Sequence, residues 1–210
     1  MTPIVRLQAI ACALPQINID TDQVFPARYM KEARRPPSGY APYLFHDLRR
    51  GSDGELREDF PLNAPINQGV GIIAAGRNFG SGSSREGAVY ALVDAGVRCV
   101  LAPSYGDIFA ANAVNNGLLP ARVDEHDMEV LFTLLAPGGV RMNLDLQACN
   151  LTVERRSFDF TVDPVWRTRL LNGWDEIDMT RRHAEDIAAW CRHDRELRPW
   201  AQLPFEPAAA

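Results

Sequence analysis

Apolar residues along the middle of the chain fall into short blocks that alternate with stretches of helical spacing. Runs of strand length at 69–75, 97–102 and 118–123 predict buried strands. Between them, residues 85–95 and about 107–115 place apolar side chains three and four positions apart, which predicts helices. Because strands and helices alternate here, the pattern predicts an α/β layer with some parallel strand pairing.

The segments on either side of this layer follow other patterns. Residues 4–26 indicate one or two short strands around a polar turn at 18–23, and 31–65 form an irregular, proline-containing stretch. Residues 140–146 and 149–163 alternate apolar and polar positions, which predicts an antiparallel hairpin. An ordered loop as long as 31–65 is uncommon in a compact domain and is more often functional than idle.

Helical spacing returns at 124–135 and again near the end of the chain. The tail predicts one helix near 166–172 and another at about 180–192. No linker divides the sequence, so we expect a single domain over its whole length. Its expected parts are a core at about 1–163 and a helical tail at about 164–210.

Composition and charge are those of an ordinary globular protein. The 210 residues are 46% hydrophobic and 23% charged, and 27 acidic against 22 basic residues give a net charge of -5. This mild acidity argues against non-specific nucleic-acid binding. No run is long and apolar enough to cross a membrane, and no signal peptide is recognised, so we expect a cytoplasmic protein.

Cysteine and histidine are dispersed along the chain. The four cysteines include no C-x-x-C pair and the four histidines no H-E-x-x-H pair. The cysteines stand at 12, 99, 149 and 191, and the histidines at 46, 126, 183 and 193. We therefore expect this chain to bind no metal or cofactor by itself.

The segment with the strongest chemical pattern is N-F-G-S-G-S-S-R-E-G, residues 78–87, between a predicted strand and a predicted helix. Ser83 and Glu86 fit the S-x-x-E capping box, which predicts Ser83 as the helix N-cap. Free amides at the helix start would then favour a carboxylate or phosphate, and Arg85 adds a planar cationic fork. A capped helix without any ligand is the alternative. A phosphate loop is disfavoured because Arg85 replaces the third glycine of G-x-G-x-x-G.

Several blocks in the same order and spacing resemble one family, the small subunits of 3-isopropylmalate dehydratase in the aconitase superfamily. The matching blocks cover most of residues 16–123. They are N-I-D-T-D-Q at 18–23, P-A-R-Y-M at 26–30, N-F-G-S-G-S-S-R-E at 78–86, A-P-S-Y-G-D-I-F at 102–109 and N-N-G-L-L-P at 115–120. Each block alone would be weak, whereas the set is highly specific.

The resemblance implies an α/β fold, namely a swivelling three-layer β/β/α domain like the last domain of aconitase. It also implies a hydro-lyase that interconverts 2-isopropylmalate and 3-isopropylmalate through 2-isopropylmaleate in leucine biosynthesis. A separate large subunit would carry a 4Fe–4S cluster with one open iron, which acts as a Lewis acid on the leaving hydroxyl. This chain would be inactive without that partner, in a heterodimer or heterotetramer.

By the same resemblance, the first serine of S-S-R is the base that removes the carbon-bound proton, which here is Ser83. Ser84 and Arg85 would bind the substrate. The cap and base interpretations of Ser83 compete, because an N-cap oxygen accepts backbone N–H bonds. They can also agree, because helix-end amides would stabilise an alkoxide.

Two further pairs of substrate-binding residues follow from the family pattern. Thr21 and Asp22 match a threonine–aspartate pair near the aconitase-type active site, although a turn-forming role is the alternative. Arg34 and Arg35 lie in the loop by which the family selects its substrate. Solvent-exposed arginines without a ligand are the alternative for that pair.

Three departures from the family pattern bear on the substrate. Ser81 stands where the common pattern has cysteine, Gly87 where it usually has histidine, and Pro36-Pro37 makes the 31–45 loop unusual. All three leave Ser83, Ser84 and Arg85 in place. A related hydro-lyase acting on another substituted malate or maleate therefore stays a second hypothesis, and a non-catalytic module a third.

Overall fold

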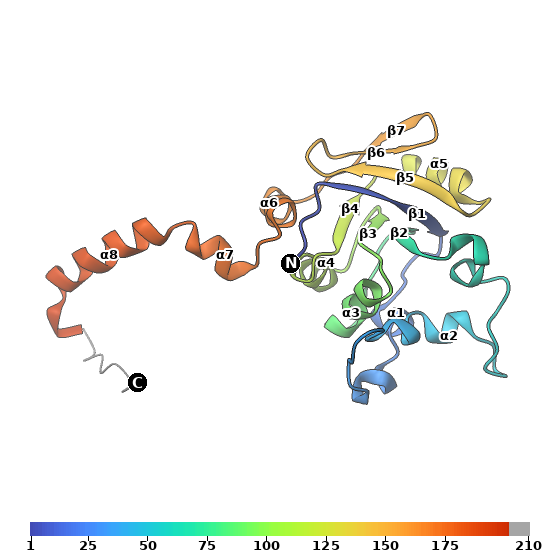
Figure 1. The fold of residues 1–210 in the computed structure, drawn as a ribbon, viewed down its shortest axis with the longest axis horizontal. Helices are drawn as coiled ribbons and strands as arrows, with labels where there is room; N and C mark the ends of the chain where they lie inside the picture. The colour runs from blue at the N-terminus through green and yellow to red at the C-terminus, as the bar shows by residue number, and fades with distance from the viewer. Residues whose placement is uncertain (202–210) are drawn as a thin grey trace. The chain divides into compact units, whose positions relative to one another are not determined.

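The computed structural model describes residues 1–201 and divides them into two compact units, the first at 1–173 and the second from Trp174 onward (Figure 1). The second unit contains α7 (Glu176–Arg181), α8 (Ala184–Leu197) and a short 3-10 turn at Pro199–Ala201. The helix predicted at about 180–192 corresponds to α8, which begins after a turn at residues 182–183 and extends to Leu197, whereas α7 is not predicted by the sequence pattern. The single domain predicted over the whole chain stays a prediction.

Within the described residues, seven strands of the first unit form one mixed sheet in the order β4-β3-β2-β1-β5-β6-β7. The strands β1 to β4 run parallel to one another. Strand β5 pairs antiparallel with β1, and β6 and β7 continue the sheet, each antiparallel to the strand before it. The bounds are β1 Arg6–Leu14, β2 Val70–Ala75, β3 Cys99–Ala102, β4 Leu119–Arg122, β5 Val140–Asp145, β6 Asn150–Val153 and β7 Arg156–Asp159. The predicted parallel layer is confirmed, and the predicted hairpin is correct but gains a third strand.

The helices of the first unit follow the predicted spacing closely, apart from two short ones. Their bounds are α1 Thr21–Val24, α2 His46–Arg49, α3 Glu86–Asp94, α4 Asp107–Asn115, α5 Glu125–Leu135 and α6 Pro164–Asn172. The turn predicted at 18–23 is wrong in part, because α1 begins inside it. Irregular residues 27–67 are built from single 3-10 turns at Ala27–Lys31, Ala41–Tyr43, Pro61–Asn63 and Pro65–Asn67, together with α2.

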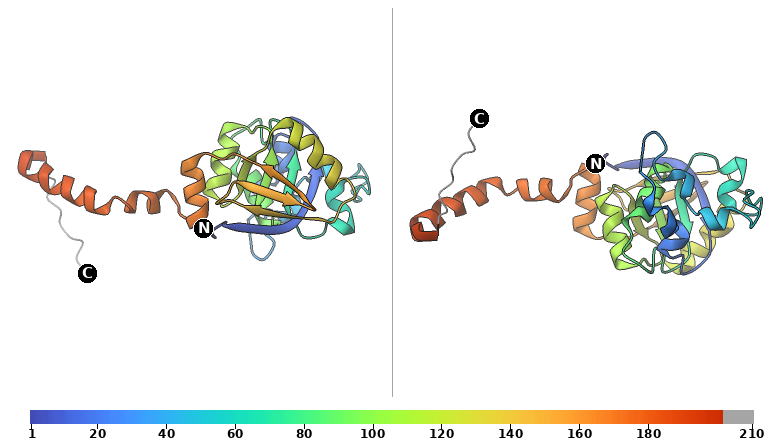
Figure 2. Two further views of the ribbon diagram at one scale, coloured as in Figure 1. Left: turned by 90° about the horizontal axis from the view of Figure 1, so that it is seen from above. Right: turned by 90° about the horizontal axis from the view of Figure 1, so that it is seen from below.

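Two hydrophobic cores lie on opposite faces of the sheet. One packs α3 and α4 against the parallel strands through Phe25, Phe79 and Val89, among others. The other contains Leu101 of the parallel half and Leu144 of the antiparallel half, with residues of α5 between them. The helices α3 and α4 therefore cover one face of the sheet, and α5 packs on the other face, where both halves of the sheet share one core; Figure 2 shows the sheet and its helices from above and below. The predicted α/β class is confirmed.

Candidate active site

The serine loop, residues 76–85, leaves the sheet at the end of β2 and is fastened to the segment before α1. The Gly80 N–H donates to the Ile19 carbonyl at 2.7 Å, and the Thr21 N–H donates to the Ser81 carbonyl at 2.9 Å. The Thr21 hydroxyl donates to the Ser83 carbonyl at 3.0 Å. The backbone of the loop is therefore held by residues about sixty positions earlier in the chain.

The capping box predicted at Ser83 and Glu86 is wrong. Helix α3 begins at Glu86 with Arg85 as its N-cap, and no side chain hydrogen-bonds to the cap. A tight turn in which the Arg85 N–H donates to the Ser83 carbonyl at 2.7 Å delays the helix start. The Glu86 carboxylate instead accepts from the Asn116 amide at 2.8 Å. The exposed Ser83 hydroxyl is consequently not used for capping.

A true capping box lies in the preceding segment. The Asp20 carboxylate accepts from the Gln23 N–H at 2.8 Å, and the Gln23 side chain accepts from the Asp20 N–H at 2.9 Å. This pair starts α1 and leaves its next two residues, Thr21 and Asp22, for other contacts. Thr21 is buried and fixes Ser83 as described above, so its role differs from that of a turn former.

Arg85 and Asp22 form an ion pair that joins the serine loop to α1. The Asp22 carboxylate also accepts from the Ala27 N–H at 2.8 Å. The Arg85 side chain is only 22% exposed, whereas that of Asp22 is 53% exposed. Four of the predicted site residues, Thr21, Asp22, Ser83 and Arg85, are therefore brought together. Ser84 follows Ser83 in the loop and is exposed.

Ser81 and Ser83 line a pocket of about 220 Å³ next to the loop. Its other wall is the segment from Gly106 to Phe109 at the start of α4. Gly80 lies at the base of this pocket with a left-handed φ of 71°, and a Cβ there would lie 2.2 Å from Phe109 Cγ. Glycine at position 80 is thus required for the close approach between the loop and α4.

Arg34 lies at the opposite end of α3 and is not brought to the serine loop. Its guanidinium donates to both Asp94 oxygens at 2.8 and 2.7 Å and lies over the Tyr90 ring, 4.1 Å from the centroid. The Tyr40 N–H also donates to Asp94, at 2.7 Å. Burial alone would raise the pKa of Asp94, but the hydrogen bonds from Arg34 and Tyr40 outweigh it and lower that pKa.

Arg35 is the same type of residue as its neighbour Arg34 but has different surroundings. Its side chain is exposed and makes no hydrogen bond or ion pair within residues 1–201. The Arg35 carbonyl accepts from the Gly39 N–H at 2.9 Å, which closes the turn at the tip of the loop. The structure therefore leaves one of the two predicted loop arginines available for a ligand.

A polar network that the sequence did not suggest joins the two ends of the loop at residues 31–45, called the substrate loop below. The His46 ring contacts the Tyr29 hydroxyl at 3.0 Å and the Asp47 carboxylate at 2.9 Å. Arg28 holds Asp47 with both terminal nitrogens, one of them at 2.7 Å from Oδ2. Hydrogen bonds from Arg28 lower the pKa of Asp47 to about 2. Residues 17 to 19 positions apart carry no spacing signal that could have revealed this network.

The departure from the family pattern at Gly87 has a local structural explanation. A Cβ at this glycine would lie 2.9 Å from Cδ1 of Phe25, a fully buried ring. Phe25 in turn contacts Tyr40, with ring centroids 4.6 Å apart. The missing side chain at position 87 therefore lets the aromatic cluster of the substrate loop pack directly against α3.

The described residues offer no metal centre. No group of three or more His, Cys, Asp or Glu side chains within residues 1–201 could hold a metal ion. Cys12 and Cys99 are buried, and burial raises the pKa of the Cys12 thiol to about 11. This set does not fit an iron–sulfur cluster, which needs several thiolate ligands close together. None of the helices in the described part is long and apolar enough to cross a membrane.

Comparisons with known proteins agree on one group. Residues 1–126 match the model of the aconitase C-terminal domain. The chain is 41% identical to the 3-isopropylmalate dehydratase small subunit of Bacillus pumilus over 90% of this chain and 95% of the relative. It is 42% identical to that of Rhodospirillum centenum over 93% and 96%. The crystal structure of a 3-isopropylmalate dehydratase from Methanocaldococcus jannaschii shares the fold, with a TM-score of 0.62 and 23% identity over 88% of this chain and 98% of that one.

Proposed function

Because the chain belongs to the aconitase C-terminal domain family, among the small subunits of 3-isopropylmalate dehydratase, we propose that it is the small subunit of such an enzyme. Together with a large subunit it would interconvert 2-isopropylmalate and 3-isopropylmalate through 2-isopropylmaleate in leucine biosynthesis. A heterodimer or heterotetramer in the cytoplasm would be the active form, and this chain alone would be inactive. The iron–sulfur cluster would belong to the large subunit, since the described residues do not fit one.

The observation that supports this proposal is that Ser83 has a fixed backbone and an available hydroxyl. Its carbonyl is fixed by Thr21, whereas its exposed hydroxyl is not used as a helix cap. In the proposed reaction, Ser83 Oγ takes the proton from the substrate carbon and returns one in the reverse direction. A positioned base of this kind contributes roughly 10²- to 10⁴-fold to a rate. The positive end of α3 would favour the charged state of the serine oxygen.

The neighbouring residues have separate proposed roles. Arg85 would bind a substrate carboxylate, which replaces or joins Asp22 as the partner of its guanidinium. Ser84 would donate a hydrogen bond to a substrate oxygen, and Asp22 would orient Arg85 before the substrate arrives. Thr21 is a positioning residue, because its hydroxyl is already used on the Ser83 backbone.

The two loop arginines would divide the work of substrate selection. Arg35 has an unused guanidinium and would contact the substrate when the loop faces the large subunit. Arg34 would act indirectly, by holding the loop to Asp94. The unusual Pro36-Pro37 sequence in this loop is the feature that supports the second hypothesis, a related hydro-lyase for another substituted malate or maleate.

The deciding experiment combines this chain with its large subunit under anaerobic conditions. Isomerisation of 2-isopropylmalate is followed beside the hydration of citraconate and of cis-aconitate. We expect the first activity to dominate and to fall at least about 10²-fold in Ser83→Ala. Ser52→Ala, which changes an exposed serine far along the chain, is the matched control and should keep full activity.

Three results would contradict parts of the proposal. Preferred hydration of citraconate would favour the related hydro-lyase. Full turnover by this chain without a large subunit would contradict the split enzyme. An absence of all three activities in a correctly assembled complex would favour the non-catalytic module.

A further inference from the structure

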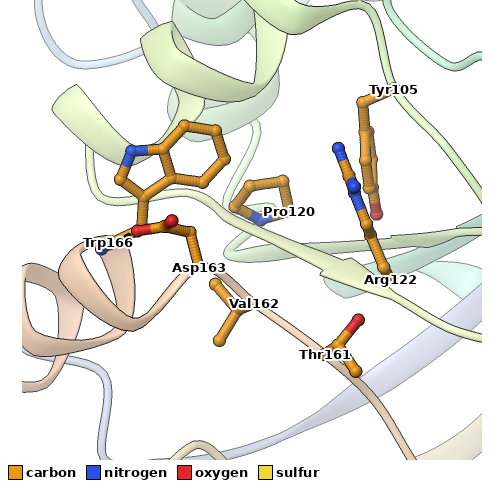
Figure 3. Close-up of a pocket in the computed structure, with 7 residues that line it drawn as sticks. All are labelled: Tyr105, Pro120, Arg122, Thr161, Val162, Asp163 and Trp166. Atoms are coloured by element: carbon orange, nitrogen blue, oxygen red, sulfur yellow. Dashed lines mark hydrogen bonds between the residues drawn. The ribbon is translucent and has the colours of Figure 1, made fainter.

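A second pocket lies at the carboxyl end of β4, within the first unit, and the function proposed above does not use it (Figure 3). It has a volume of about 360 Å³. The lining residues come from the segment before α4, from β4, from the connection between β7 and α6, and from the first turn of α6. They are Tyr105, Pro120, Arg122, Thr161, Val162, Asp163 and Trp166.

The two walls of the pocket are joined by backbone hydrogen bonds. The Arg122 N–H donates to the Thr161 carbonyl at 2.9 Å, and the Thr161 N–H donates to the Arg122 carbonyl at 2.8 Å. The backbone of Arg122 is therefore fixed against that of Thr161, two residues before Asp163, and the exposed Arg122 and Asp163 side chains project from these two segments. A pre-formed pocket of this kind avoids much of the ordering cost of binding.

Two opposite charges face this pocket without pairing with each other. Figure 3 shows the Arg122 guanidinium and the Asp163 carboxylate on either side of Pro120. Neither side chain forms an ion pair with any residue in 1–201. Asp163 Oδ1 caps α6 by accepting from the N–H groups of Val165 and Trp166 at 2.8 and 3.1 Å. Asp163 Oδ2 takes no part in that cap.

Apolar residues lie between the two charges. Pro120 is buried at the floor, and Val162 and the Trp166 indole are half-buried beside it. The Tyr105 hydroxyl donates into the protein, to the carbonyls of Val100 and Ala121 at 2.8 and 2.7 Å. Tyr105 therefore offers the pocket its ring and not its hydroxyl.

We propose that this pocket binds a free α-amino acid with an aliphatic side chain. The ligand carboxylate pairs with Arg122, its ammonium group pairs with Asp163 Oδ2, and its side chain lies against Pro120 and Trp166. A simple anion would satisfy Arg122 but would bring its charge near Asp163, and a simple cation would meet the reverse problem. The volume lies within the roughly 300–1,000 Å³ typical of small-molecule sites.

The test measures binding to the full chain by isothermal titration calorimetry with three matched probes. L-leucine carries both charged groups, 4-methylpentanoate lacks only the ammonium group, and 3-methylbutylamine lacks only the carboxylate. We expect L-leucine to bind, and each fragment to bind at least about tenfold more weakly, because each loses one charge-assisted hydrogen bond.

Two variants separate the charges of the site. Arg122→Gln should abolish the advantage of L-leucine over 3-methylbutylamine, and Asp163→Asn its advantage over 4-methylpentanoate. Asparagine caps helices about as well as aspartate, so α6 should persist in Asp163→Asn. Arg141→Gln, at an exposed arginine of β5, is the matched control and should bind L-leucine like the wild type. Circular dichroism confirms that each variant is folded.

Three outcomes would overturn the inference. One is no binding of L-leucine at millimolar concentration. Another is equal binding of L-leucine and 4-methylpentanoate, which would reduce the site to an anion site. The third is that Arg122→Gln and Asp163→Asn weaken assembly with the large subunit while L-leucine does not bind. That result would make these residues part of a protein interface instead.

Discussion

The two ends of helix α3 each carry predicted site residues, but they differ in how much of their chemistry is already used. Before its first turn, Ser83 and Ser84 expose their hydroxyls and the N-cap has no side-chain partner. At its last residue, Asp94 receives three hydrogen bonds from Arg34 and Tyr40. The N-terminal end of α3 thus keeps its hydroxyl groups available on a fixed backbone. At the C-terminal end, the polar groups are already bonded to each other and hold the substrate loop to the helix.

This difference explains why neighbouring residues of one type have different proposed roles. Arg34 and Arg35 both lie in the loop that the resemblance assigns to substrate selection, yet only Arg34 forms an ion pair with Asp94. A buried or half-buried charge is retained where it is paired, and Asp94 is only 14% exposed. The loop is therefore positioned by one arginine, and the other is left to contact a ligand.

The largest effect on stability is expected from disturbing the packing of the serine loop at the N-terminal end of α3. Gly80→Ala would place a Cβ 2.2 Å from Phe109 Cγ at a left-handed φ. We expect the free energy of unfolding, measured in urea, to fall by about 2–4 kcal/mol. Gly54→Ala is the control, because its φ is also left-handed but no atom lies within 4 Å of the added Cβ. It should lose only about 1 kcal/mol, and an equal loss in both variants would contradict the packing argument.

The next effect comes from the other end of α3. Asp94→Ala removes the acceptor of Arg34 and of the Tyr40 N–H, so we expect a loss of about 1–3 kcal/mol in the free energy of unfolding. The Arg57–Asp59 pair is more exposed, at 47% and 71%, so Asp59→Ala is the control and should leave the free energy of unfolding nearly unchanged. In the reconstituted enzyme, Asp94→Ala should raise KM more than it lowers kcat.

A smaller effect is expected from His46, which joins the two ends of the substrate loop. The chain has one lysine, Lys31, at the end of the 3-10 turn that carries Tyr29. Lysyl endopeptidase therefore cuts the folded chain at a single position, and its rate reports opening of the loop. His46→Phe keeps an aromatic ring but loses the hydrogen bonds to Tyr29 and Asp47 and the longer contact with Arg28, so cutting should become several-fold faster. His126→Phe is the control, and an unchanged rate in His46→Phe would rule out the fastening role.

The smallest effect is a pH dependence at Asp47. Its pKa is lowered to about 2 in the folded chain, from an ordinary value of 3.8. The stabilisation from its contact with Arg28 is therefore fully present above about pH 5 and is lost as the pH falls toward 2. The difference in Tm between the wild type and Asp47→Asn should shrink between pH 7 and about pH 2.5. A Tm difference that stays constant over this pH range would contradict a stabilising contact between Arg28 and ionised Asp47.

The sequence predicted regular elements better than local contacts. The helices α3, α4 and α5 were found because their apolar spacing is strong and glycine or proline follows them. Helix α1 was missed because its four residues are too short for a periodic signal. Helix α7 was missed, and the predicted helix at about 180–192 runs through the turn at residues 182–183, because no glycine or proline marks that turn.

The two capping-box sequences show most clearly that a local sequence pattern can be compatible with more than one structure. Both D-x-x-Q at Asp20 and S-x-x-E at Ser83 fit a capping box, but only the first forms one. At the second, Thr21 from a distant part of the chain binds the Ser83 carbonyl, and the helix begins at Glu86 with Arg85 as its N-cap. Likewise, the assignment of Arg34 to Asp94 depends on a contact across sixty residues. Such contacts are set by the tertiary fold, so neighbouring sequence does not reveal them.

The most direct test of the central claim follows proton exchange at the substrate carbon. The reconstituted two-subunit enzyme is incubated with 3-isopropylmalate in deuterium oxide, and incorporation at the carbon-bound position is measured by NMR. If Ser83 is the base, Ser83→Ala should slow this exchange at least about 10²-fold, while the substrate still binds within a few-fold of its wild-type affinity. Exchange at the wild-type rate in Ser83→Ala, with substrate bound, would contradict the account.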